Sequence, residues 1–127
     1  MRYLLDTHAV IWYLDESLRL PTRTETVIDN SVNRVYVSSV SLWEIAIKTN
    51  LGKLKLNATF DEFLGKVRNS ECEILQIKDE YLKRLSVLPS VHKGPFDRLL
   101  VSTAIVENLT LITADDNIRK YGVQWIW

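Results

Sequence analysis

The sequence is poor in cysteine, proline and glycine, and neither sign of charge is in excess. One cysteine, Cys72, excludes an intrachain disulfide and a cysteine-based zinc site. Sixteen Lys and Arg balance 16 Asp and Glu, so bulk positive charge cannot be the basis of nucleic-acid binding, which leaves only a local basic patch. Four Gly and three Pro leave long segments for regular structure, and no repeat or low-complexity linker is present. We therefore expect residues 1–127 to form a single domain.

Long hydrophobic runs are also missing near the start of the chain. The longest unbroken apolar run there, 9–14, is far shorter than the roughly 20 residues that a membrane span needs. Asp6 interrupts any segment that resembles the core of a signal peptide. Together with the scarcity of cysteine, this pattern predicts a cytoplasmic protein with no membrane association.

Strand-like and helix-like segments alternate along the chain. Short apolar or β-branched runs predict strands at 2–5, 34–38, 73–77 and 109–113, and a last edge strand at 123–126. Helices are expected at 7–14, from 22 onward, and at 41–51, 59–69, 78–87, 95–107 and 115–121. Their predicted end signals are capping boxes at Thr22…Glu25 and Thr59…Glu62, a stop at Gly52, and Pro95 in a first turn. This alternation predicts an α/β fold with a mainly parallel central sheet and helices on both faces.

Acidic residues follow two of these strands. Asp6 comes directly after the first strand, and Asp115 and Asp116 lie just past the strand at 109–113. Glu44 and Asp97 lie in helices that can pack beside the same edge. Ligands of parallel α/β sheets bind outside the carboxyl ends of the strands. Carboxylates gathered there would repel one another unless a cation neutralised them, and all-oxygen ligation suits Mg²⁺ or Mn²⁺. Such a site suits metal-assisted hydrolysis of phosphodiesters.

Each acid also has an explanation that needs no ligand. Asp6 and one of the pair Asp115 and Asp116 can cap helices, and Asp97 can complement the positive end of a helix dipole. Glu44 precedes Lys48 by four residues, which is the spacing of a helical ion pair. We expect Asp115 to lie in the turn at the sheet edge and Asp116 to cap the short helix that follows.

Four strings resemble, in their order and spacing, the motifs of the PIN-domain family, and closely those of VapC-type toxin ribonucleases from toxin–antitoxin pairs. They are Leu-Leu-Asp-Thr-His at 4–8, Ser-Leu-Trp-Glu-Ile-Ala-Ile-Lys at 41–48, Pro-Phe-Asp-Arg-Leu-Leu at 95–100 and Leu-Ile-Thr-Ala-Asp at 111–115. The resemblance spans nearly the whole chain and implies a three-layer α/β/α PIN fold.

The same resemblance implies a function and a site. The function is Mg²⁺- or Mn²⁺-dependent endoribonuclease, in which metal-activated water cleaves RNA and leaves 3′-hydroxyl and 5′-phosphate ends. Asp6 and Asp97 would be the main metal ligands, and Glu44 and Asp115 would hold a second metal or its waters, with Asp116 as an alternative. Implied partners are the RNA substrate, a cognate antitoxin protein and a second copy of the chain in a homodimer.

Basic and aromatic residues near the acids are candidates for RNA contact. Lys48, Lys93 and Arg98 flank the acids in sequence and can anchor phosphates, whereas Lys53 and Lys55 fit ordinary solvated surface better. The tryptophans can stack on bases, but core or subunit packing is favoured for Trp12 and Trp43. His8 stands where many relatives have Asn, and its contribution to the site is left open.

Two other interpretations remain at this stage. A catalytically silent PIN-fold interaction module would need none of the four acids. Another Mg²⁺-dependent phosphohydrolase is the second: a haloacid-dehalogenase-like phosphatase needs a second Asp where the chain has His8, and no P-loop or Gly-x-Ser-x-Gly elbow is present.

Overall fold

The computed structural model describes residues 1–91 and 94–127 and contains a five-stranded sheet. The strands are β1 (Arg2–Leu5), β2 (Arg34–Ser38), β3 (Glu73–Leu75), β4 (Thr110–Ile112) and β5 (Trp125–Ile126). They lie in the order β3-β2-β1-β4-β5, and every neighbouring pair is parallel. The parallel α/β fold predicted from the alternation of strands and helices is confirmed.

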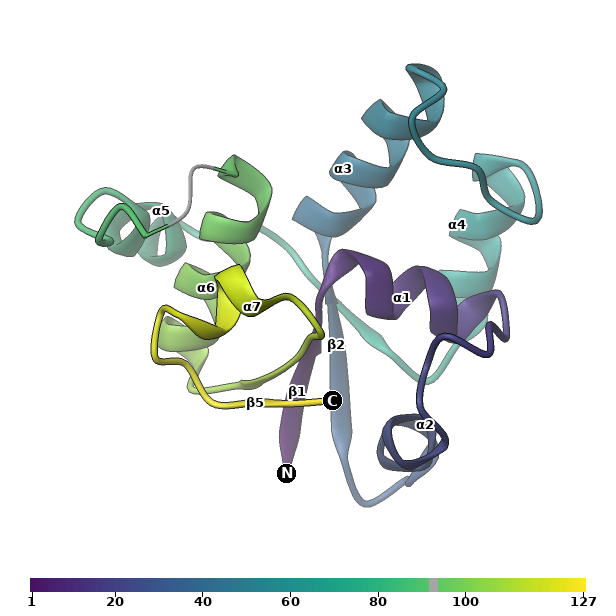
Figure 1. The fold of residues 1–127 in the computed structure, drawn as a ribbon, viewed down its shortest axis with the longest axis horizontal. Coiled ribbons are helices and arrows are strands. Elements are labelled where there is room, and N and C mark those ends of the chain that lie inside the picture. The colour runs from purple at the N-terminus through teal and green to yellow at the C-terminus, as the bar shows by residue number, and fades with distance from the viewer. Residues whose placement is uncertain (92–93) are drawn as a thin grey trace.

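Helices cover both faces of this sheet (Figure 1). They are α1 (Thr7–Leu14), α2 (Thr22–Asp29), α3 (Ser39–Asn50), α4 (Phe60–Asn69), α5 (Asp79–Leu85), α6 (Pro95–Glu107) and α7 (Asp116–Arg119). Alternate residues of β1 serve different layers, because successive side chains of a strand point to opposite faces. Leu5 packs in one core with residues of α1, α3 and α4, and Leu4 packs in a second core with residues of α6 and α7.

Local sequence signals predicted some of the helix ends correctly and others wrongly. Thr59 caps α4 as predicted, accepting from the backbone N–H of Glu62 at 3.1 Å. Gly52, with φ of 70°, follows the C-cap of α3, and Pro95 is the first residue of α6. The box predicted at Thr22 is wrong: α2 begins after Pro21, which makes no side-chain cap. The start predicted at Ser41 is also wrong, because Ser38 accepts from the N–H of Val40 and α3 begins at Ser39.

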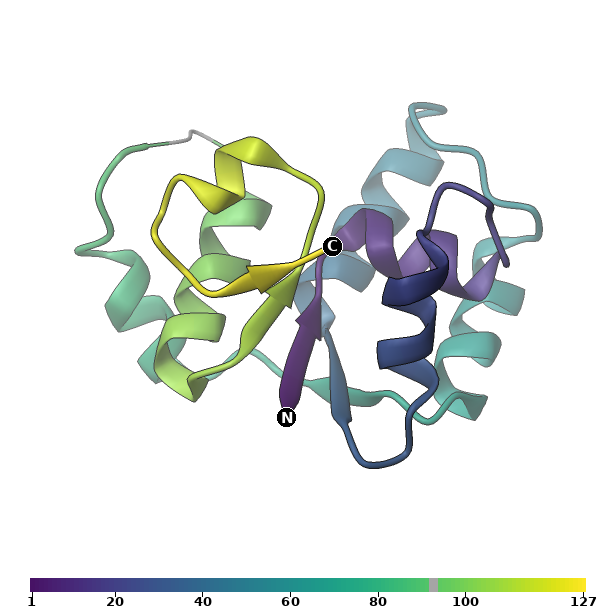
Figure 2. The ribbon, with the colours of Figure 1, turned by 60° about the horizontal axis from the view of Figure 1, so that its bottom comes forward.

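Strand order places the end of β1 at the middle of the sheet. β2 and β4 flank β1, and the backbone N–H of Asp6 donates to the carbonyl of Ile112 at 3.1 Å. Turning the molecule shows β5, which leads to the C-terminus, beside β4 (Figure 2). Trp127 contacts the ring of Trp12 on α1, with ring centroids 5.7 Å apart. The carboxyl edge of β1 and β4 is therefore surrounded by segments from both ends of the chain.

Within the described ranges, none of the helices combines the length and apolar character needed to cross a membrane.

Candidate active site

Asp6 stands at the centre of the carboxyl edge, between β1 and α1. It is 5% exposed and is the N-cap of α1, since its Oδ1 accepts from the N–H of Ala9 at 2.8 Å. Its Oδ2 accepts from the hydroxyl of Thr113 at 2.5 Å. The helix-capping explanation of Asp6 is therefore correct, and the second oxygen still faces the end of β4.

Burial raises the pKa of Asp6 from its ordinary 3.8 to about 6. Desolvation is the largest cause, and the hydrogen bonds from Thr113 and Ala9 oppose it. The charge of His8 also lowers the pKa, whereas the charge of Asp97 raises it. The ionised form of this buried carboxyl group is stabilised by any cation that binds beside it.

Glu44 lies on α3 and is 6% exposed. Its Oε1 accepts from the hydroxyl of Thr7 at 2.6 Å, and its Oε2 accepts from the ammonium of Lys48 at 2.5 Å. The hydroxyl of Ser41 lies 3.1 Å from that of Thr7. Because Thr7 follows Asp6 directly, this network joins the carboxylate of α3 to the start of α1. The expected ion pair with Lys48 is formed, and Glu44 also belongs to the acidic edge.

Asp97 lies in the first turn of α6 and is partly buried. It is near enough to Asp6 for its charge to raise the pKa of that carboxyl. The structure thus brings a third helix to the same edge, as the parallel-sheet prediction required.

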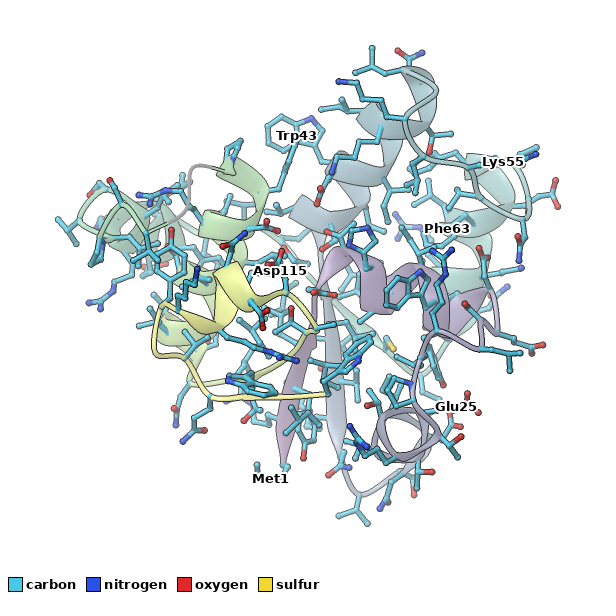
Figure 3. The ribbon with its side chains drawn as sticks, in the orientation of Figure 1. Met1, Glu25, Trp43, Lys55, Phe63 and Asp115 are labelled. Atoms are coloured by element: carbon cyan, nitrogen blue, oxygen red, sulfur yellow. The ribbon has the colours of Figure 1, made fainter. Side chains whose placement is uncertain are left out.

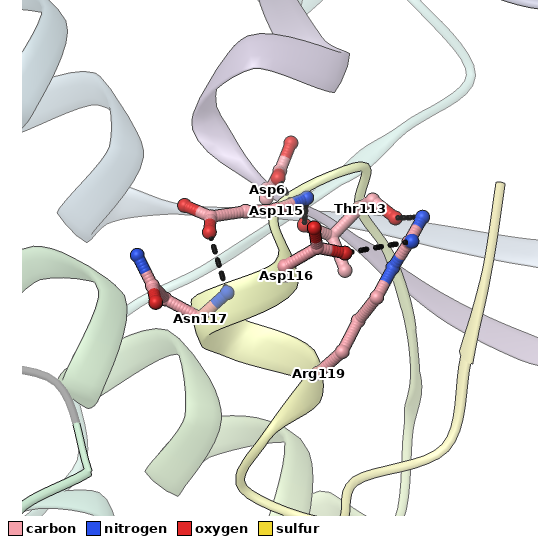
Figure 4. A network of polar contacts seen from close by, with 6 residues as sticks. All are labelled: Asp6, Thr113, Asp115, Asp116, Asn117 and Arg119. Atoms are coloured by element: carbon pink, nitrogen blue, oxygen red, sulfur yellow. Dashed lines mark hydrogen bonds and ion pairs between the residues drawn. The ribbon is translucent and has the colours of Figure 1, made fainter.

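Asp115 takes the capping role that the sequence predicted for Asp116 (Figure 4). Asp115 is the N-cap of α7 and accepts from the N–H of Asn117 at 2.8 Å. Asp116 is largely exposed and pairs with Arg119 at 3.2 Å. The prediction that Asp116 caps the helix was wrong, because α7 begins at Asp116 itself and the preceding residue, Asp115, is therefore the N-cap. Asp115 remains the acid beside the sheet edge, since its N–H donates to the hydroxyl oxygen of Thr113 at 3.0 Å.

Thr113 and Arg119 hold this corner together. The hydroxyl of Thr113 donates to Asp6 and accepts from Asp115, so one oxygen bridges the two acids. Arg119 donates to the carbonyl of Thr113 at 3.0 Å (Figure 4). Its guanidinium lies 3.7 Å from the ring centroid of Trp125. Sequence reasoning missed Arg119 and Thr7. Their position next to candidate acids, three residues after Asp116 and one after Asp6, was the only available signal.

The predicted RNA-contacting cations have different surroundings. Lys48 is 40% exposed beside Glu44, so it lies at the rim of the acidic edge. Arg98 donates to the carbonyls of Leu88 and Pro89 at 3.2 and 3.0 Å, which ties the segment before α6 to that helix. Lys93 lies outside the described residues.

The chemistry of the donors fits a hard divalent cation. Asp6, Glu44, Asp97 and Asp115 supply carboxylate oxygens, and hydroxyl groups lie between them. Mg²⁺ and Mn²⁺ prefer such ligands. In the part of the chain that the structure describes, no three His, Cys, Asp or Glu side chains are grouped as ready metal ligands. The oxygens of Asp6 and Glu44 accept from protein donors instead.

Comparison with known proteins adds a family and a fold. A family model described as PIN domain matches residues 3–124. No curated protein matches the chain significantly in sequence.

Three of the similar solved structures are complexes. VapBC2 from Rickettsia felis, bound to a DNA fragment from their promoter, is 22% identical at a TM-score of 0.70, covering 99% of this chain and 98% of that chain. FitAcB from Neisseria gonorrhoeae is 18% identical at a TM-score of 0.70, covering 98% and 96%. VapBC-1 from nontypeable Haemophilus influenzae is 16% identical at a TM-score of 0.71, covering 99% and 97%. At these identities the likeness shows a shared fold.

Proposed function

Because this chain belongs to the PIN-domain family, we propose that it is a metal-dependent endoribonuclease and the toxin of a toxin–antitoxin pair. PIN domains are generally nucleases, and Mg²⁺ or Mn²⁺ is the cofactor we propose. The support for RNA as substrate is the likeness of the four sequence strings to VapC-type toxins. The cytoplasmic location and the single domain expected from the sequence stay predictions.

The observation that carries the proposal is the connection of the other three acids to Asp6. Thr113 links Asp6 to Asp115, and Thr7, the residue after Asp6, donates to Glu44. The charge of Asp97 acts on Asp6. Two of these acids are almost fully buried, and burying a carboxylate costs free energy unless a partner offsets it. A catalytically silent interaction module has no use for this arrangement, which disfavours that alternative.

The proposed division of work follows from the positions of the side chains. Asp6 and Asp97 would be the main ligands of the cation, and Glu44 and Asp115 would hold a second cation or its waters. Asp116 would not contribute, because its side chain is largely exposed and pairs with Arg119. When bound, the cation supplies activation of water and neutralisation of charge on the phosphate. Thr113 fixes the orientation of Asp6, and Thr7 fixes that of Glu44. Lys48 offers its ammonium at the rim, where it reduces the repulsion between Glu44 and an approaching phosphate.

The partners are proposed on the similar structures. The VapBC and FitAcB structures are toxin–antitoxin complexes, and this chain covers at least 96% of the matched chain in each of the three. We propose a cognate antitoxin that binds this chain and a homodimer as its assembled form. Both are tested by co-expression with a small neighbouring gene product and by measuring the mass of the complex.

The decisive experiment is cleavage of RNA by the purified chain freed of any partner. Labelled RNA and single-stranded DNA of the same sequence are incubated with Mg²⁺, Mn²⁺ or EDTA. We expect RNA cleavage only with the metals, and loss of at least a hundredfold in rate for Asp97→Asn. Asp61→Asn is the matched control, because Asp61 occupies the first turn of α4 as Asp97 does that of α6. Full cleavage in EDTA, or equal rates for Asp97→Asn and Asp61→Asn, would contradict the metal mechanism.

A further inference from the structure

A pocket of about 550 Å³ lies beside the acidic edge, on the exposed side of α1. His8 and Trp12 line it from α1, Ser17 and Arg19 from the segment before α2, and Lys55 and Asn57 from the segment between α3 and α4. Figure 3 shows Lys55 on that last segment, with the start of α1 between Lys55 and Asp115 in this view. The volume is in the range of pockets that bind small organic groups.

The pocket lies next to the acidic edge along α1. His8 lines the pocket and is two residues after Asp6, whose pKa its charge lowers. Trp12 is one turn farther on the same helix face, because residues four apart lie one above the other. At 1.5 Å per residue, Trp12 is about 9 Å along the helix from Asp6, a distance that one or two nucleotides of extended single strand can bridge.

The pocket has an aromatic wall with a fixed orientation. The rings of His8 and Trp12 have centroids 5.5 Å apart at 41°. Trp127 contacts Trp12 edge-on at 5.7 Å, so the C-terminal residue holds the indole in place. Trp12 is partly buried and packs against the core, as the sequence favoured, and it also lines the pocket.

Two exposed cations border the same wall. The guanidinium of Arg19 lies 5.9 Å from the ring centroid of Trp12, and Lys55 lines the pocket from the opposite segment. Asp15 and Glu16 lie at the other end, where they also line the neighbouring depression against α4. Aromatic rings with flanking cations are the combination that holds single-stranded nucleic acid, through stacking and phosphate contact. Most of the lining is polar, unlike the apolar groove that receives a peptide helix.

We propose that this pocket is a subsite for an unpaired RNA base, which stacks on Trp12 and His8 while Arg19 and Lys55 contact the flanking phosphates. This inference rests on the proposed function, because it takes RNA as the substrate. The base it holds lies one or two nucleotides from the phosphate at the acidic edge. The pocket thereby sets which position along the strand is cleaved.

Binding of a fluorescein-labelled single-stranded oligoribonucleotide in EDTA tests the subsite without cleavage. Trp12→Leu keeps an apolar side chain but no ring, and we expect it to weaken binding about tenfold or more. Trp12→Phe restores a ring and should restore most of the affinity. Lys55→Gln should weaken binding and reduce its salt dependence, whereas Lys53→Gln, on the same segment but outside the pocket, should not.

A scan with single abasic nucleotides keeps the test independent of how the variants fold. Wild-type protein should lose affinity at one abasic position, one or two nucleotides from the cleaved bond, and Trp12→Leu should show no further loss there. Equal affinity at every abasic position, or unchanged RNA binding by Trp12→Leu, would overturn the proposal. Unchanged RNA binding together with lost binding to the antitoxin would assign the pocket to the protein partner instead. Specific binding without metal-dependent cleavage would contradict the nuclease proposal and leave the subsite standing.

Discussion

Replacing Asp6 with Asn should stabilise the metal-free protein at neutral pH while abolishing cleavage. Burial places the pKa of Asp6 at about 6 in the folded chain, against its ordinary 3.8. One pKa unit corresponds to about 1.4 kcal/mol, so holding the ionised carboxylate at pH 7.5 costs about 3 kcal/mol of stability. Asn removes this charge and remains a good N-cap, able to accept from the N–H of Ala9.

A part of this gain is lost at Thr113. The hydroxyl that donates to Oδ2 of Asp6 would face the amide N–H₂ of Asn, and losing one hydrogen bond costs about 1 kcal/mol. The net stabilisation is about 2 kcal/mol, which for a chain of this size raises Tm by about 6–10 °C.

The pH dependence has a defined sign. Between pH 3.8 and about 6 the folded chain binds the proton of Asp6 more tightly than the unfolded chain does, so the contribution of Asp6 to stability falls as pH rises through this window. The advantage of Asp6→Asn should therefore be small or absent at pH 4 and complete above pH 7.

The assay is thermal unfolding of both proteins in EDTA at pH 4 and pH 7.5, repeated at pH 7.5 with Mn²⁺. At 100 times its dissociation constant Mn²⁺ adds about 2.7 kcal/mol to a protein that binds it, so it should close or reverse the difference in favour of wild type. Asp61→Asn serves as an exposed control, and its difference in Tm from wild type should change with neither pH nor Mn²⁺. A lower Tm for Asp6→Asn in EDTA at pH 7.5, or an equal difference at both pH values, would refute the reasoning.

Three further predictions concern the residues around Asp6. Asp115→Ala should reduce the cleavage rate strongly and lower the stability of the fold by about 0.5–2 kcal/mol, because Asp115 lies beside the sheet edge and is also the N-cap of α7. Asp116→Ala should change stability by less than about 0.5 kcal/mol and keep the cleavage rate of the wild type, since Asp116 is largely exposed. Cleavage rates and melting of both variants decide this, and an inactive Asp116→Ala beside an active Asp115→Ala would reverse the assignment. Thr113→Val keeps the shape but loses the bridging hydroxyl, so stability should fall by about 1–3 kcal/mol and cleavage at least tenfold, with Thr113→Ser retaining both; an active Thr113→Val would show that the bridge is dispensable. Lys48→Gln leaves the buried Glu44 without its counter-charge, so denaturant unfolding should show a loss of stability without metal that Mn²⁺ restores in part, whereas Lys53→Gln should show neither effect.

The agreement between sequence and structure is closest where the signal is local. The bounds of β1, β2, α1 and α6 are those predicted, because apolar patterning, Asp6 and Pro95 define these segments within a few residues. The failures at Thr22, Ser41 and Asp116 are also local. Several neighbouring Ser, Thr or Asp residues could cap each helix, and the free-energy difference between adjacent caps is too small for sequence alone to choose.

By itself the sequence determined the parallel α/β order and the presence of acids just past two strands, because side-chain periodicity and the geometry of parallel sheets are properties of short segments. Tertiary structure decided the contacts that give those acids their state. The bond from Thr113 to Asp6 joins residues 107 positions apart, and the bond from Thr7 to Glu44 joins residues 37 apart. The pocket at Trp12 likewise needs three separate segments of the chain. Such contacts depend on how layers pack over the whole domain, where many small energies are summed, and no spacing along the chain encodes them.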